Sequence, residues 1–187
     1  TLSGDLKISF YDNNNSYISV KPVNLLQINK EKWYDSKKIE HFYTYVNKAV
    51  LFKNQEKFDG GILKGLDSTF PFDNLKNYLV DGRFLDISNT ESLEIIISTK
   101  TSKKLSLKAG DFVSSFFYDF SKSKFPKKRL FQVVGIYNTG FGDFDENFSF
   151  TNIRVLQKVN GWNDYEVGGI ELILKNQFKT SNYKEIV

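Results

Sequence analysis

The side chains best suited to chemistry in this chain are the acids of the segment TGFGDFDEN, residues 139–147. Asp143, Asp145 and Asn147 would suit the first, third and fifth positions of a Ca²⁺-binding loop. Such a loop needs Gly at its sixth position and Glu at its twelfth, where this sequence has Phe148 and Arg154. An acid/base pair lacks support too, because nothing in the sequence places a second group opposite the aspartates. We therefore interpret the segment as a solvated bend between two strands.

Other catalytic or nucleotide-binding patterns are incomplete. His41 is the only histidine, so it cannot build a multi-histidine metal site, and no G-x-S-x-G motif supplies a nucleophile for it. Gly60 and Gly65 have the spacing of a phosphate-binding loop, but Leu66 stands where that loop requires lysine. We therefore predict a structural or surface role for His41, and a protein that is not an enzyme and has no metal, nucleotide or other cofactor.

A basic segment before residue 130 is the remaining candidate site. One interpretation is a solvated turn, because runs of charged residues usually form solvated surface. The other is a docking element, because an exposed Phe beside Pro among cations is unfavourable unless a partner covers it. Its residues are Lys122, Lys124, Phe125, Pro126, Lys127, Lys128 and Arg129. We expect this segment to be the tip of a hairpin that contacts a partner.

The composition limits the classes of protein that this chain can represent. Its 187 residues suit one domain or two small lobes with a shared core, and 40% hydrophobic residues are enough for that core. Phe must fill much of it, because there are 18 Phe and no Met or Cys. The net charge of +4 argues against a dedicated nucleic-acid binder. No segment is apolar enough to span a membrane, and the start at Thr1 predicts a fragment or a processed product.

Hydrophobic periodicity predicts strands and short helices in alternation. Leu6, Ile8 and Phe10 alternate with polar residues, which is typical of a half-buried strand. Asp73 and Gly82 suit the N-cap and C-cap of a helix between them. Further strands are predicted at residues 16–22, 41–52, 60–67, 93–98, 112–118, 130–137, 147–150 and 167–175. Further helices are predicted at residues 24–38, 98–107 and 152–162, with the start of another after 176 and a turn at 13–16.

The order of these elements predicts an α+β fold. Both ends of the chain carry β-α-β units, and the middle is rich in strands, including a hairpin of residues 112–118 and 130–137. We expect residues 1–57 to pack with residues 145–187.

Several segments together resemble the extracytoplasmic domain of FtsX/MacB-type ABC transporter permeases, with the lipoprotein-releasing (LolC/LolE-type) branch nearest. Their order and spacing across residues 62–174 make the resemblance specific. The beginning of the chain, LSGDLKISFYDNNNS, is similar to the segment that follows the first membrane helix of such a permease. The segments are ILKGLDSTF, YLVDGRF, ISTKTSKKLSLKAGD, RLFQVVGIYNTGFGDFD and VNGWNDYEVGGIELIL.

The resemblance implies a two-lobed, MacB-like periplasmic core. A Porter-like lobe would combine residues 1–57 with 145–187, and a strand-rich Sabre-like lobe would comprise residues 58–144. The domain would lie in the periplasm, between the first two helices of an inner-membrane permease that forms a dimer. A separate cytoplasmic subunit would hydrolyse ATP, which agrees with the absence of catalytic motifs here.

The same resemblance suggests partners for the basic segment. In lipoprotein-releasing permeases the corresponding hairpin carries a protruding hook that grips a periplasmic carrier. The connection YDFSKSKFPKKR is shorter here, and residues 122–129 match the hook. We expect a periplasmic carrier or a lipoprotein cargo as partner. The alternatives are a free-standing secreted binding module and a secreted hydrolase, and the latter would need a convergent carboxylate or Ser/His site that the sequence does not show.

Overall fold

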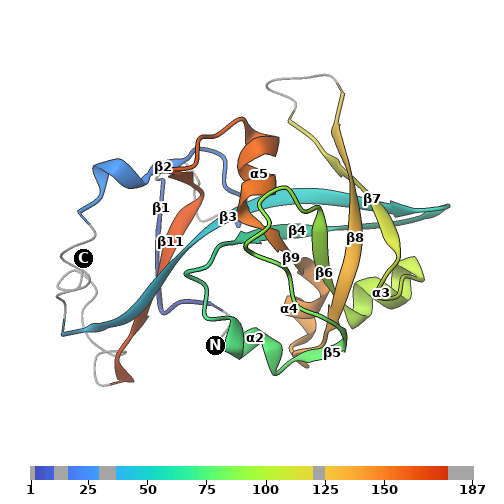
Figure 1. Cartoon of the computed structure of the whole chain (residues 1–187), viewed down its shortest axis with the longest axis horizontal. Helices are drawn as coiled ribbons and strands as arrows, with labels where there is room; N and C mark the ends of the chain where they lie inside the picture. The colour runs from blue at the N-terminus through green and yellow to red at the C-terminus, as the bar shows by residue number, and fades with distance from the viewer. Residues whose placement is uncertain (1–2, 11–16, 30–36, 120–124, 177–187) are drawn as a thin grey trace.

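One mixed sheet organises the computed structural model, which describes residues 3–10, 17–29, 37–119 and 125–176. Nine strands follow the order β1-β11-β3-β4-β9-β6-β8-β5, with β7 paired to both β3 and β8 (Figure 1). The strands are β1 (Leu6–Ser9), β3 (Ile39–Asn54), β4 (Lys57–Leu66), β5 (Leu79–Gly82), β6 (Glu94–Ser98), β7 (Phe112–Phe117), β8 (Lys127–Tyr137), β9 (Phe148–Asn152) and β11 (Gly169–Leu174). A small second sheet pairs β2 (Val23–Asn24) with β10 (Glu166–Val167).

The long hairpin of β3 and β4 is the central element of the fold. β4 is parallel to β9, β9 pairs with β6, and β6 is parallel to β8. β8 pairs with β7, and the end of β7 returns to residues 51–53 of β3, which closes a ring of strands. On the first half of β3, residues 39–45 pair instead with β11, which in turn pairs with β1. β3 therefore connects a closed barrel to an open antiparallel sheet.

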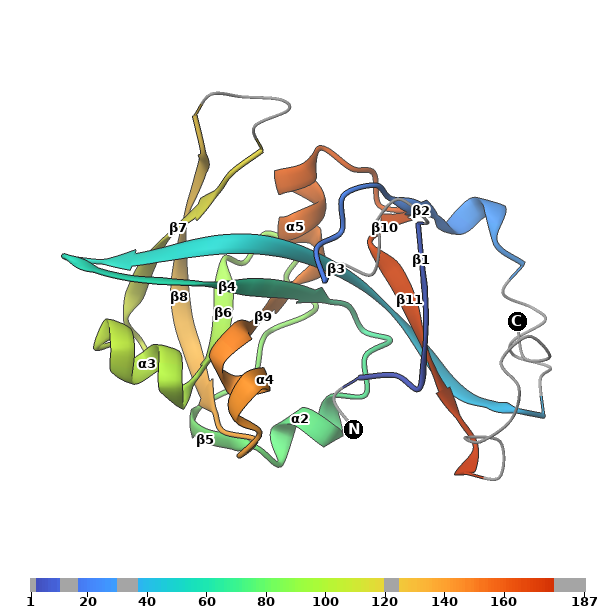
Figure 2. The same ribbon diagram turned by 180° about the vertical axis from the view of Figure 1, so that it is seen from behind.

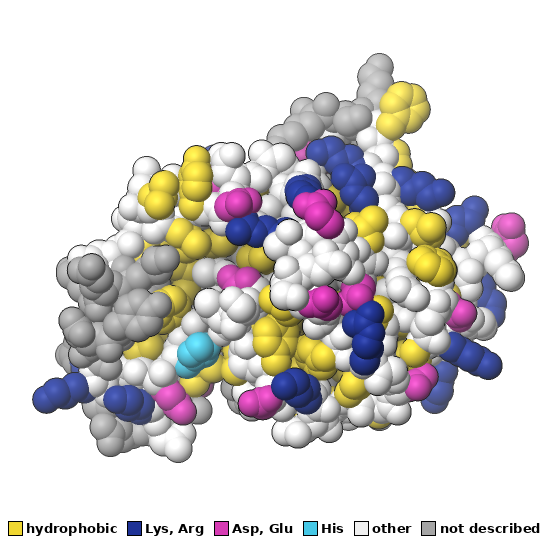
Figure 3. Space-filling model, in the orientation of Figure 1, with side chains coloured by type: hydrophobic (Ala, Val, Ile, Leu, Met, Phe, Trp, Pro, Cys, Tyr) yellow, Lys and Arg dark blue, Asp and Glu magenta, His cyan; other side chains and the backbone are white. Residues whose placement is uncertain are grey.

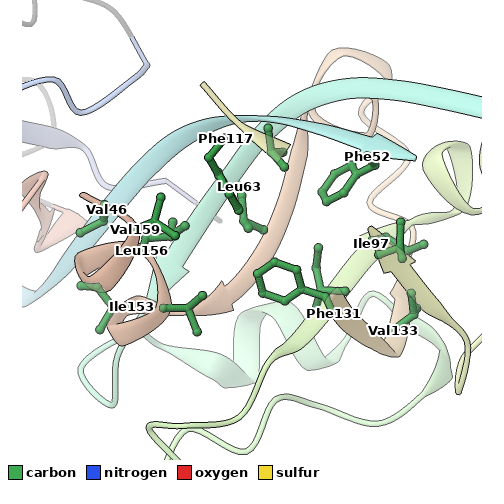
Figure 4. Packing of buried hydrophobic residues seen from close by; sticks show 14 of the residues in the cluster. Val46, Phe52, Leu63, Ile97, Phe117, Phe131, Val133, Ile153, Leu156 and Val159 are labelled. Carbon is green, nitrogen blue, oxygen red and sulfur yellow. The ribbon is translucent and has the colours of Figure 1, made fainter. Parts of the chain in front are cut away.

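Apolar side chains from all sides of the ring fill its interior. Phe52, Leu63, Ile97, Phe117 and Phe131 each expose 2% of their surface or less, and they point toward one another in Figure 4. The rings of Phe117 and Phe131 meet edge to face, with their centroids 6.5 Å apart. Phe is thus a principal filler of the core, as the composition predicted.

Short helices cover the β3–β4 ribbon on both sides. α5 (Ile153–Asn160) lies above the ribbon in Figure 1, whereas α3 (Thr99–Leu105) and α4 (Gly142–Asn147) lie below it, and Figure 2 shows the same arrangement from behind. Asn152 caps the start of α5 with a side chain that accepts a hydrogen bond from the Arg154 amide, and Gly161, with φ +72°, caps its end. These are the polar N-cap and glycine C-cap that favour a helix of this length.

Most predicted elements are confirmed, and the fold is α+β. The strand at Leu6–Ser9, the buried strand β6, the helices α3 and α5 and the antiparallel pairing of β7 with β8 all lie where the pattern predicted them. The turn predicted at residues 13–16 and the helix start after residue 176 lie outside the described residues. The division into two lobes stays a prediction.

The helix predicted at residues 24–38 is wrong over its described part. Asn24 ends β2, a single 3₁₀ turn η2 (Leu25–Gln27) follows, and Ile28 is already extended. The Asn24 side chain caps this turn, but no residue of the turn is fully buried and Leu25 packs only partly against the core, which is little support for a longer helix. Residues 17–22 are not a strand either.

The helix predicted between Asp73 and Gly82 is also wrong in its second half. Helix α2 (Phe72–Lys76) has Pro71 rather than Asp73 at its N-cap position, with no side-chain cap, and the chain then forms β5 on the edge of the sheet beside β8. Gly82 has φ +76°, and a Cβ there would lie 2.3 Å from the carbonyl oxygen of Val134. The glycine therefore serves a close approach between strands and not a helix end.

Candidate functional site

The β7–β8 hairpin displays its side chains on two distinct faces. Ser115 and Phe117 of β7 face the barrel and are buried, whereas Phe112 on the opposite face is 57% exposed. In Figure 1 both strands rise beyond α5, and Figure 3 shows Lys and Arg side chains gathered over this part of the molecule. Lys122 and Lys124 lie outside the described residues. The hairpin itself is therefore a projection with a basic surface.

The structure separates the cations that the sequence grouped at this tip. Lys127 Nζ donates a hydrogen bond of 2.6 Å to the carbonyl oxygen of Val159, in the last turn of α5. A cation at a helix C-terminus is favourable there, because free carbonyl oxygens carry partial negative charge. Lys128 lies over the Phe116 ring, 5.8 Å from its centroid. The Arg129 guanidinium donates to the carbonyl oxygen of Lys128.

The apolar part of the tip remains accessible. Phe125 is 80% exposed, the largest exposed fraction among the described large hydrophobic side chains, and Pro126 beside it is partly buried. The structure thus brings Phe125, Pro126 and Lys128 together at the end of the hairpin. It directs Lys127 toward the body of the molecule instead.

The acidic segment is a helix and not the solvated bend that the sequence predicted. α4 covers residues 142–147, and Asp145 inside it is only 2% exposed. Its carboxylate accepts hydrogen bonds from the Thr139 amide at 3.2 Å, the Thr139 hydroxyl at 2.7 Å and the Gly140 amide at 3.1 Å. Glu146 instead pairs with Lys100 of α3 at 2.5 Å. Asp145 and Glu146 therefore have partners within the protein, and the described residues contain no group of three acids, histidines or cysteines placed to hold a metal.

The other motifs also have structural explanations. His41 Nε2 makes a hydrogen bond with the Thr69 carbonyl oxygen, which connects β3 to the loop after β4. Gly60 and Gly65 lie within β4, so they form no phosphate loop. A Cβ on Gly65 would lie 2.8 Å from the Cα of Ile153, so the glycine allows α5 to pack closely against the strand.

A buried ionic cluster centred on β11 was not predicted from the sequence. Glu171 of β11 is 5% exposed, and its carboxylate pairs with Lys64 Nζ of β4 at 2.8 Å. It also accepts hydrogen bonds from the Tyr43 hydroxyl and, at 2.6 Å, from the Gly4 amide. The only signal in the sequence was a glutamate inside the apolar run GIELIL. The cluster joins β11, β4, β3 and the residues just before β1.

The electrostatics of this cluster favour the charged form of Glu171. Burial by itself would raise its pKa, but the charge of Lys64 and the three hydrogen bonds together hold the pKa below its usual value. Burial and the neighbouring carboxylate raise the pKa of Tyr43. Lys7 lies over the Tyr45 ring at 5.1 Å, and burial lowers its pKa.

A cleft of about 590 Å³ opens between α2, the segment after β5 and the beginning of α5. Hydrophobic side chains are visible in the middle of the face shown in Figure 3, near the position of α2. The cleft has an apolar interior and a polar rim. Its lining residues are Asp67, Ser68, Phe72, Lys76, Phe84, Leu85, Ile87, Ser88, Thr90, Asn152, Ile153 and Arg154. Pockets of this size are typical of small-ligand sites.

No family model matches the sequence, and no curated protein matches it either. Among the described residues, no helix has the length and the apolar character needed to cross a bilayer.

The fold, by contrast, has clear relatives among solved structures. The extracellular domain of the noncanonic ABC-type transporter YknZ from Gram-positive bacteria matches with a TM-score of 0.59 at 16% identity, over 94% of this chain and 85% of that one. The periplasmic region of MacB from Actinobacillus actinomycetemcomitans matches with a TM-score of 0.60 at 13% identity, over 96% of this chain and 78% of that one. The chain therefore has the same fold as these extracellular and periplasmic domains.

Proposed function

We propose that this chain is the extracytoplasmic domain of an ABC transporter permease, which couples ATP hydrolysis by a cytoplasmic subunit to work in the periplasm. The shared fold over nearly the whole chain is the observation that carries the proposal. The domain would belong to an inner-membrane permease that forms a dimer, with release or export of lipoproteins as its task.

The described ends of the chain suit a domain inserted between two membrane helices. The Asp5 amide donates to the carbonyl oxygen of Leu172, and the Leu174 amide donates to the Asp5 carboxylate, each at 2.8 Å. The chain thus enters β1 beside the point where it leaves β11. This pairing also supports a Porter-like lobe built from residues 1–57 and 145–187, with residues 58–144 as the Sabre-like lobe.

The exposed hairpin tip is the proposed docking element for a periplasmic carrier or the lipoprotein itself. Phe125 offers an apolar anchor, and Pro126 stiffens it, which lowers the entropy lost on binding. Lys128 adds positive charge that speeds the encounter with an acidic surface. Lys127 contributes less, because it is bound to α5.

The transporter proposal is tested with the protein encoded by the complete gene, purified from membranes together with its neighbours. Copurification with an ATPase, and retention of lipoproteins in the inner membrane when the permease is depleted, are the expected results. Recovery of the protein in soluble form without an ATPase would favour the alternative, a free-standing secreted binding module.

The docking proposal is tested by capture of the carrier or lipoprotein with Phe125→Ala and with Lys128→Glu. Loss of a buried aromatic anchor typically costs about 2 kcal/mol, which is a roughly thirtyfold loss of affinity. Phe141→Ala is the matched control, since Phe141 is 69% exposed elsewhere on the surface. If both hairpin variants bind as the parent does, the docking surface lies elsewhere.

A further inference from the structure

We propose that the cleft between α2 and α5 binds a linear alkyl chain that ends in an anionic group. The proposal concerns the cleft alone and holds whether or not the domain belongs to a transporter. The volume of about 590 Å³ is within the range of small-ligand sites.

The interior of the cleft is apolar and well supported. Leu85 and Ile153 lie at its base and expose only 7% and 4% of their surfaces. Phe72 and Phe84 are partly buried and meet edge to face, with centroids 5.3 Å apart, and Ile87 adds a further apolar side chain. Aromatic pairs of this geometry hold each other in place, so the apolar surface is largely preformed. An alkyl chain that covers it would gain the free energy of removing that surface from water.

Several polar groups of the lining already have partners within the protein. The Asp67 carboxylate accepts hydrogen bonds from the amide and hydroxyl of Thr69, and the Ser88 hydroxyl donates to Asp86. The Asn152 side chain caps α5 and donates to a carbonyl oxygen of the neighbouring segment. A peptide bound here would need new partners for its own amide groups, because unpaired buried amides are costly. An alkyl chain has no such requirement.

Two cations on the rim favour an anion at the end of that chain. Lys76 pairs with Asp73, whose side chain is 95% exposed, and Arg154 pairs with Asp164, whose side chain is 81% exposed. Ion pairs with such exposed partners contribute little to stability. A ligand anion can therefore replace either carboxylate at small cost. Asp67 also lines the cleft, and its carboxylate already accepts hydrogen bonds from Thr69. Its negative charge repels an anion, so the anionic end of the ligand must lie away from it.

The test is a titration of the 187-residue chain with decanoate, decyl phosphate and decanol below their aggregation concentrations, followed by calorimetry and by NMR of the Ile and Leu methyl groups. We expect saturable binding of both anions, with shifts concentrated at Leu85, Ile87 and Ile153. The two anions distinguish a carboxylate ligand from a phosphate ligand. Decanol should bind at least tenfold more weakly than the better anion.

Variants of Lys76 and Arg154 test whether these two rim cations cause the preference for an anionic ligand. Lys76→Gln together with Arg154→Gln should weaken binding of the anions about tenfold and leave decanol unchanged, whereas Lys103→Gln on α3 is the control and should have no effect. Equal binding of decanol and the anions, shifts outside the cleft, or an unchanged affinity of the double variant would each overturn the proposal. Binding of an acidic apolar peptide without binding of either alkyl anion would overturn it too.

Discussion

Neutralising Glu171 should destabilise this domain more than any comparable change of a surface acid. Glu171→Gln keeps the size of the side chain and removes the charge that balances Lys64, 2.8 Å away. Both side chains are almost completely buried, at 6% and 5% exposed. The buried lysine would then lose the carboxylate that compensates it.

The expected loss follows from this burial. Breaking a buried ion pair by removing one partner costs about 3 kcal/mol or more, because the remaining charge is uncompensated. Cation–π contacts of Lys64 with the rings of Tyr43 and Tyr45, at 5.3 and 5.1 Å, offset part of that loss. For a chain of this length, about 3 kcal/mol corresponds to a fall in Tm of roughly 6–12 °C.

The assay is thermal and urea unfolding of the parent, Glu171→Gln, Lys64→Met and the double variant. The double variant should be more stable than the sum of the two single losses predicts, because it leaves no unpaired buried charge. Glu146→Gln is the matched control and should unfold like the parent, since the side chain of Glu146 is 60% exposed in its pair with Lys100.

The dependence on pH gives a second readout of the same carboxylate. The pKa of Glu171 is lower in the folded protein than in the unfolded chain, so its contribution is complete above the unfolded pKa. That contribution is lost as the pH falls through the lower, folded pKa. The parent should therefore lose stability in acid more steeply than Glu171→Gln. Equal Tm values for these two proteins, or strictly additive losses in the double variant, would refute the reasoning.

Three further changes test the local structure, each by urea unfolding. Gly65→Ala should destabilise by about 1–3 kcal/mol, because its Cβ would meet the α5 backbone at 2.8 Å, and an unchanged midpoint would contradict that packing. Asp145→Asn should cost about 1–3 kcal/mol by leaving donors of the 139–140 loop unpaired, whereas Asp143→Asn should not. Lys127→Met should lose about 0.5–1 kcal/mol at the end of α5, and Lys128→Met is its comparison; equal losses would argue against the helix contact.

Strong local patterns predicted much of the fold correctly. The apolar run before residue 99, the hairpin of β7 and β8, and α5 with Asn152 before it and Gly161 after it all formed where the sequence placed them. These elements combine the right periodicity with their own caps or turns, so local and tertiary preferences agree. Weak patterns failed. Residues 79–82 fit a helix by spacing, but pairing with β8 on the sheet edge made them a strand.

The candidate sites were also predicted only in part from the sequence. The position of Phe125 and Pro126 in the hairpin connection followed from the sequence, because two strong strands flank that connection. The roles of the nearby cations did not, since Lys127 depends on a carbonyl oxygen of α5, 32 residues away along the chain. Asp145 looked like a surface acid because the sequence does not show that the 139–140 loop folds back to place the Thr139 amide and hydroxyl and the Gly140 amide on its carboxylate.

By itself, the sequence determined the α+β class, an aromatic core and the absence of complete catalytic motifs, because these depend on composition, periodicity and short spacing. Only the tertiary structure decided the closure of the barrel through β7 and β3, the burial of Glu171 against Lys64 and the cleft beside α2. Each of these joins residues far apart in the chain, and one-dimensional patterns carry no information on which distant side chains meet. Glu171 and Lys64 are separated by 107 positions, and only the pairing of β11 and β4 with β3 between them brings their charges into contact.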